Sequence, residues 1–163
     1  MINDHDILSI IRTDDVSFFK DMIDDGLDPN KLVLTNQVPL IFYASGNSAY
    51  KILSFLIDVD DIDINAKYKG SNTLFSIIRR STYNRVISNA IIKLLKNDAE
   101  LIDSKNNSFE QGMNIWNKKD IQEALCEYRP EHVPDLVKTG VFIYPEIKEK
   151  YKHLFSAERA GIL

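Results

Sequence analysis

The sequence predicts an all-α fold: a stack of three to four helix-turn-helix units closed by a C-terminal helix. Apolar residues recur at helical spacing along the chain, and similar segments return at intervals of 33 to 38 residues. Glycine and proline number only six and five among 163 residues, which disfavours a turn-rich β fold. With 44% hydrophobic and 27% charged residues, the composition is that of one folded domain, which we place at residues 1–163.

The first unit covers about residues 4–34. Its first helix has one apolar face, formed by Ile7, Leu8, Ile10 and Ile11. We expect Asp4 to cap this helix and Asp15 to cap the next one, since aspartate is a preferred N-cap residue. Gly26 then permits the left-handed turn that commonly ends a helix.

The second and third units cover about residues 35–69 and 70–105 and repeat this plan. Leu40 and Leu74 occupy matching places in the first helices, 34 residues apart. Each second helix ends in a pair of apolar residues: Met22-Ile23, Leu56-Ile57 and Leu94-Leu95. The turns that follow close at Asn30, Asn65 and Asp103, which are 35 and 38 residues apart.

A fourth unit is predicted at about residues 106–142. It contains a helix over 119–128 and a shorter second helix over 132–141, which ends near Gly140. We expect Trp116 to pack inside this unit; an exposed Trp116 would instead be an interface candidate. Pro145 predicts the first turn of a last helix over 145–158. This helix either caps the stack or is a detachable amphipathic segment that docks on a partner.

These segments resemble the ankyrin-repeat family over about residues 5–142. The family pattern is Thr-Pro-Leu at the first helix and Leu-Leu followed by Gly-Ala-Asp-Val-Asn-Ala after the second. Here Val38-Pro39-Leu40 and Asp63-Ile64-Asn65-Ala66 occupy these places, while Ile41 and Phe75 replace the family's histidine. The resemblance implies a concave surface, made from the first helices and the turn tips, that binds another protein.

The resemblance also places the partner-binding residues. It points to the turn tips, at 31–37 and around residue 68, and to the ends of the first helices. The residues expected to contact a partner are Gln37, Ser45, Tyr68, Lys69, Ser71, Arg79 and Arg80. Tyrosine and arginine are favoured anchors in protein interfaces, so Tyr68, Arg79 and Arg80 are the leading candidates.

Charge is distributed unevenly along the chain. Residues 1–66 contain twelve aspartates and four basic residues, a net charge of −8, whereas residues 67–163 have a net charge of +4. The acidic part repels phosphate, so we expect no nucleic-acid ligand. Two interpretations stay open: two solvated faces that differ in charge, or an acidic docking surface.

The sequence contains no pattern typical of a catalytic or metal site. His5, His132 and His153 are isolated, and Cys126 is the single cysteine. The aspartates of 58–63 lack the glycine and the final glutamate of a calcium loop. We therefore expect no enzyme activity, no metal and no cofactor. The alternative is a small enzyme with its site in 106–163, recognisable by a pocket where at least two titratable groups converge.

The function expected is that of a non-enzymatic module that binds one protein through its concave face. Short, acidic, ankyrin-like proteins of bacteria resemble immunity proteins that mask a toxin, and an acidic surface suits a basic toxin. The alternative is a host-protein-binding ankyrin protein or domain of a secreted bacterial or viral effector. No membrane span or signal peptide is visible, so we expect a protein of the bacterial cytoplasm, or of the host cytoplasm for an effector. We expect it to be a monomer when free of its partner.

Overall fold

The computed structural model describes residues 2–80, 82–101 and 113–155. Over these residues the chain is mostly helical, and strands are limited to one short hairpin. The expected all-α class is confirmed. No helix within the described ranges is both long and apolar enough to cross a bilayer.

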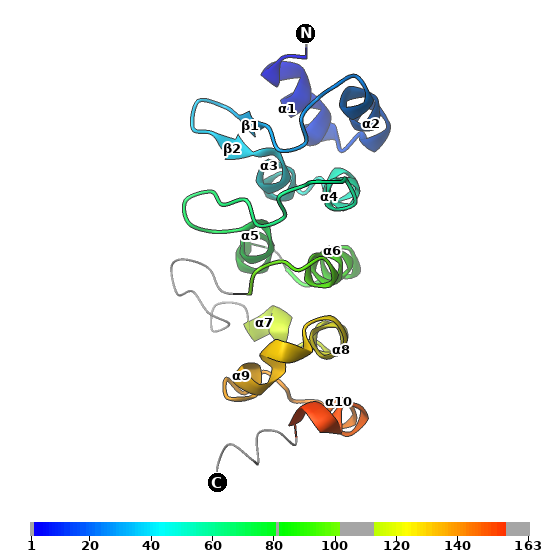
Figure 1. Ribbon diagram of the computed structural model, residues 1–163, viewed down its shortest axis with the longest axis vertical. Helices are drawn as coiled ribbons and strands as arrows, with labels where there is room; N and C mark the ends of the chain where they lie inside the picture. Colours follow the sequence, from blue (N-terminus) through cyan, green and yellow to red (C-terminus); the bar gives the residue numbers. More distant parts are fainter. Residues whose placement is uncertain (1, 81, 102–112, 156–163) are drawn as a thin grey trace.

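The first six helices pack in three pairs. They are α1 (Asp4–Thr13) with α2 (Val16–Asp24), α3 (Leu40–Gly46) with α4 (Tyr50–Ile57), and α5 (Thr73–Arg80) with α6 (Arg85–Lys96). Each pair forms a layer, and α1, α3 and α5 lie in one column while α2, α4 and α6 lie in the other (Figure 1). Leu40 and Leu74 are both fully buried in the first column, where the layers meet.

Side-chain caps explain where these helices begin. Asn3, not Asp4, caps α1: its side-chain oxygen accepts from the Asp6 backbone N–H at 2.9 Å. The expectation for Asp4 is wrong because this residue already lies in the first turn of the helix. Asp15 caps α2 as expected, accepting from the Phe18 N–H at 3.1 Å. Asn84 caps α6 in the same way, through the Ile87 N–H.

The turns that end the second-column helices pass through the left-handed region. Gly26 has a φ of 97°, as its position predicts. In the next two layers Asp61 (φ 61°) and Asp98 (φ 63°) take this conformation, which aspartate tolerates better than most side chains. Aspartate therefore takes the place of glycine in these two layers, and the left-handed turn is kept.

A small hairpin projects from the first layer boundary. Strands β1 (Leu32–Val33) and β2 (Val38–Pro39) pair antiparallel, with Val33 opposite Val38. The turn between α4 and α5 projects on the same side of the molecule (Figure 1). The turn tip expected at 31–37 is thus a hairpin tip.

The helices after residue 112 form two further layers. They are α7 (Met113–Trp116), α8 (Lys119–Tyr128), the 3₁₀ turn η2 (Pro130–His132), α9 (Val133–Val137) and α10 (Pro145–Lys150). Helix α8 packs on α6 and therefore continues the second column, and α10 packs on α8 (Figure 1). Trp116 is fully buried, as expected.

This arrangement corrects the predicted order of the fourth unit. The sequence predicts 119–128 as the first helix of this unit and 132–141 as its second. Instead, α7 precedes α8 as its layer partner, and α9 lies on the side of α7 (Figure 1). The helix α7 has four residues, too few to show a periodic apolar pattern. The predicted boundary at 105/106 and the closing Asp103 lie outside the described residues.

The last predicted helix is interrupted at Tyr151. Helix α10 ends at Lys150, Tyr151 interrupts it, and residues 152–155 are helical again. Pro145 occupies its first turn, and Ile147 points into the core with 1% exposure, as the apolar pattern indicates. The expected end at 158 lies outside the described residues.

Candidate partner-binding site

A surface cleft lies where the turn between α4 and α5 approaches α3. It has a volume of about 270 Å³. It is lined by Phe42, Tyr68, Lys69, Ser71, Ser76, Arg79 and Arg80, and we call it the turn cleft. Five of the seven residues predicted to contact a partner line it; Phe42 and Ser76 complete it and were not predicted.

The outer wall of the turn cleft is a tight two-residue turn. Tyr68 and Ser71 exchange backbone hydrogen bonds, with N···O distances of 3.0 and 3.1 Å. Between them Lys69 (φ 51°) and Gly70 (φ 79°) are both left-handed, the conformation of a type I′ turn. The turn places the Lys69 side chain at its exposed tip.

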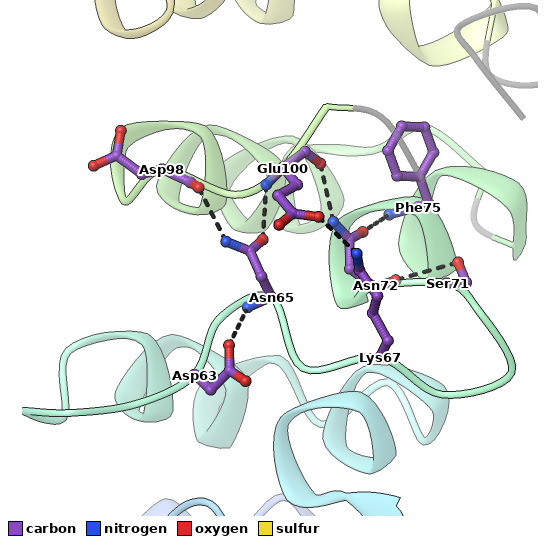
Figure 2. Close-up of polar contacts among 8 residues, drawn as sticks. All are labelled: Asp63, Asn65, Lys67, Ser71, Asn72, Phe75, Asp98 and Glu100. Atoms are coloured by element: carbon purple, nitrogen blue, oxygen red, sulfur yellow. Dashed lines mark hydrogen bonds and ion pairs between the residues drawn. The ribbon is translucent and has the colours of Figure 1, made fainter. Parts of the chain in front are cut away.

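Asn65 fastens the start of this segment to the next layer. Its side-chain oxygen accepts from the Glu100 N–H at 2.7 Å, and its amide nitrogen donates to the Asp98 carbonyl at 3.3 Å (Figure 2). Asp63 orients the residue by accepting from the Asn65 backbone N–H at 3.0 Å. One side chain thus joins two layers through main-chain groups alone.

Asn72 fastens the other end of the segment. Its amide nitrogen donates to the Glu100 carbonyl at 2.9 Å, while its oxygen accepts from the Phe75 N–H at 3.0 Å and so caps α5 (Figure 2). Lys67 adds an ion pair to the Glu100 carboxylate at 3.0 Å. Because both ends are held, the position of the turn is fixed before any partner arrives.

The first layer boundary has the same joint. The Asn30 side chain accepts from the Asp63 N–H and donates to the Asp61 carbonyl, both at 2.8 Å. Asn30 and Asn65 therefore make equivalent pairs of bonds one layer apart. The sequence pattern that ends each of the first two units has a physical role: it joins a layer to the next.

The floor of the turn cleft is aromatic and lies beneath two cations. The rings of Phe42 and Tyr68 meet edge to face, with centroids 5.3 Å apart. The Arg80 guanidinium lies 5.6 Å from the Phe42 ring centroid, and the Lys69 ammonium lies 5.3 Å from that of Tyr68. Asn36, from the hairpin tip, donates to the Tyr68 hydroxyl at 2.6 Å and links the two projecting tips.

Two buried serines hold the arginines from below. Arg79 donates to the Ser71 hydroxyl at 2.6 Å, and Arg80 donates to both the hydroxyl and the carbonyl of Ser76. Ser71 is only 7% exposed, so it supports the surface without forming much of it. Of the ion pairs between described side chains, none involves Lys69 or Arg80. Their charges are therefore available to a ligand.

The other two predicted contact residues lie outside the turn cleft. Gln37 is exposed at the hairpin tip, with a φ of 58°. Ser45 is buried at 7% exposure, and its hydroxyl donates to the Phe42 carbonyl at 2.7 Å. Gln37 can meet a partner that extends beyond the cleft, whereas Ser45 braces the helix that carries Phe42.

Titratable groups also meet near the C-terminal layers. The Tyr83 hydroxyl lies 2.9 Å from both carboxylate oxygens of Asp120, and the Ser88 hydroxyl donates to the same carboxylate. Burial and Asp120 raise the pKa of the Tyr83 phenol. Burial raises the pKa of the Cys126 thiol to about 11, which disfavours the nucleophilic thiolate. The first cluster links α6 to α8, and Cys126 lies in the core.

The described residues include no group of three His, Cys, Asp or Glu side chains placed to hold a metal ion. No family model matches the chain, and no curated protein or solved structure matches it at a significant level.

Proposed function

We propose that the chain is a non-enzymatic protein-interaction module that binds one partner protein through the turn cleft. The observation that carries the proposal is the convergence of Tyr68, Lys69, Arg79 and Arg80 with Phe42 on one surface. The ankyrin resemblance predicts that these four residues contact a partner. In the cleft they lie beside the Phe42 ring. Tyrosine and arginine supply a large share of binding energy in protein interfaces.

Rigidity supports the same proposal. Asn65 and Asn72 hold both ends of the turn, and Ser71 and Ser76 hold the arginines. A partner that enters the cleft meets side chains that are already in place, so less conformational entropy is lost on binding. This is the arrangement expected of a recognition surface.

We further propose that the fold is a degenerate ankyrin-like repeat solenoid with a C-terminal capping layer. Three features support this: layers of two helices, equivalent asparagine joints at Asn30 and Asn65, and tips that project on one side. In such a stack the tips and the first helices form the concave binding face. The turn cleft, between α3, α5 and the second tip, belongs to that face.

The biological role we propose is that of an immunity protein that masks a toxin. The twelve aspartates of residues 1–66 favour fast encounter with a basic domain, because long-range attraction raises association rates. The turn cleft then supplies a specific contact to carboxylate or carbonyl groups of the partner. The alternative role is that of an effector that binds a host protein, and the experiment below distinguishes the two roles.

The experiment is quantitative capture with the tagged full-length chain. Lysate from cells that encode it is compared with eukaryotic lysate, and three variants accompany the native chain: Tyr68→Ala, Arg80→Ala and the control Arg85→Ala, which changes an exposed arginine of α6. We expect one protein to be retained by the native chain and by Arg85→Ala, and to fall at least tenfold with either cleft variant.

Partner identity separates the roles. A basic protein encoded beside the gene supports the immunity role, and a captured eukaryotic protein supports the effector role. Equal retention by all folded variants would overturn the turn cleft as the binding site. Circular dichroism of each variant establishes that it is folded.

A further inference from the structure

The first layer has a second surface cavity on its outer side. This cavity, of about 400 Å³, lies between α1 and α2, and we call it the end groove. It is lined by Ile2, Asp6, Ser9, Ile10, Phe18, Met22 and Asp25. Phe18 is 52% exposed and is the one aromatic among the large apolar side chains that stand exposed in the described ranges.

In the end groove, apolar side chains of α1 and α2 meet solvent. On their inner side α1 packs on α3 and α2 packs on α4. No further described helix lies on the outer side, where the first layer forms the end of the described stack (Figure 1). Terminal layers of helical stacks usually present a polar outer face. A contiguous apolar groove at this place instead indicates a binding surface.

The rim of the end groove is acidic. Asp6 on α1 and Asp25 at the end of α2 line it, and Asp21 and Asp24 are exposed on the same helix as Phe18. No basic residue is among its described lining residues. The occupant must therefore combine an apolar ridge with positive charge.

Arg12 is exposed on α1 but does not line the groove, and two nearby lysines are directed elsewhere. Lys20 lies 5.4 Å from the Phe55 ring centroid, toward the next layer, and Lys31 pairs with Asp4 at 3.1 Å. Neither side chain neutralises the groove. The acidic potential at its rim is therefore left for a ligand.

We propose that the end groove binds a basic amphipathic helix of a partner protein. A groove between two helices accepts a third helix whose apolar residues recur every three to four positions. Its apolar side chains contact Ile10, Phe18 and Met22, and its flanking lysines or arginines reach Asp6 and Asp25. This site is separate from the turn cleft and does not depend on it.

The negative charge of the rim favours a basic helix over a symmetric second copy of the chain and over an anionic membrane surface. A second copy of the chain in a symmetric contact would bring the same aspartates together, where like charges repel. An anionic membrane surface would be repelled in the same way. A basic helix is the occupant that both the apolar floor and the acidic rim attract.

Fluorescence anisotropy of a labelled 14-residue leucine-lysine helical peptide tests the proposal on the full-length chain. We expect saturable binding that weakens at least tenfold in Phe18→Ser. The matched control is Val86→Ser, because Val86 is equally exposed (55%) but lies on α6, and it leaves binding unchanged. The double variant Asp6→Asn/Asp25→Asn should weaken binding at least threefold and flatten its salt dependence, whereas Asp135→Asn has no effect.

Several results would overturn the proposal. The first is that the peptide does not bind at 100 µM. The second is that Phe18→Ser and Val86→Ser lose the same amount of peptide affinity. The third is that a peptide with glutamate in place of lysine binds as tightly as the lysine peptide. Sedimentation that shows a dimer abolished by Phe18→Ser would assign the groove to a second copy instead. Circular dichroism controls for folding, and the capture experiment on the turn cleft is unaffected by any of these outcomes.

Discussion

The layers from Asp4 to Leu101 and the layers from Met113 onward are joined by different means. In the first part, short asparagine side chains join neighbouring turns, and Asn30 and Asn65 use the same two bonds. In the second part, long side chains with individual partners make the joints. The first part repeats the asparagine joint and adds individual contacts, such as that of the Lys93 ammonium to Ser54 and Asp58, whereas the contacts between described residues that join the second part are individual.

Two buried side chains illustrate the second part. Arg129 is 7% exposed and donates to the Ala99 carbonyl, at the turn after α6, and to Glu131 at 3.0 Å. Gln122 is fully buried; its amide nitrogen donates to the carbonyls of Trp116 and Val141. Neither contact has an equivalent among the described residues of the other layers.

The largest effect is expected from Arg129→Ala. The change leaves the Ala99 carbonyl without its charged donor and should lower the free energy of unfolding by about 3 kcal/mol. Urea unfolding is followed by Trp116 fluorescence, which reports on the C-terminal layers, and by circular dichroism at 222 nm, which reports on all helices. The variant should lower the midpoint of the fluorescence transition more than that of the circular dichroism transition. Arg85→Ala is the control. Equal small shifts in both variants would contradict a structural role for this arginine.

The reactivity of Cys126 gives a probe of the same layers. Burial raises its thiol pKa from 9.0 to about 11. Because the thiolate is the reactive form, a shift of this size lowers its fraction about 100-fold at pH 8. We expect slow alkylation by iodoacetamide in the native protein, a rate that rises with pH, and fast alkylation in urea. Native alkylation as fast as that in urea would show that these layers are open.

A smaller effect is expected where the two parts meet. Tyr83→Phe removes the hydroxyl that donates to Asp120 and should cost about 1 kcal/mol of stability. Tyr43→Phe is the matched control, because no hydrogen bond to a described residue involves its hydroxyl. Thermal unfolding checks both. A loss with Tyr43→Phe as large as that with Tyr83→Phe would contradict a specific contribution from this contact.

The same contrast explains what the sequence could predict. Apolar spacing was enough for the helices of the first three layers, and the caps were correct where a side chain stands just before the first turn, as at Asp15. The prediction of Asp4 as the cap of α1 was wrong because Asn3 and Asp4 are adjacent and both are good N-cap residues. The helix begins one residue later than the cap, at Asp4, so Asn3 is the cap. In the C-terminal part, α7 is too short to show a period, so the order of the helices there was wrong.

The candidate site was predicted in part. Family resemblance placed Tyr68, Lys69, Arg79 and Arg80 at tips and helix ends, and the turn cleft brings them together. Phe42 was missed because an aromatic on an apolar helix looks like any core residue, and nothing local indicates that its ring forms the floor of a cleft. Ser45 was predicted to be a contact and is buried instead, because a small hydroxyl can bond to its own helix.

Hydrogen exchange on Asn30→Ala and Asn65→Ala tests most directly the claim that each layer is fastened by its own joint. The amides of Asp63 and Glu100 donate to these two side chains, at 2.8 and 2.7 Å. Asn30→Ala should speed exchange at Asp63 several-fold and leave Glu100 unchanged, and Asn65→Ala should do the reverse. Equal acceleration at both amides in both variants would show one cooperative globule and contradict the account.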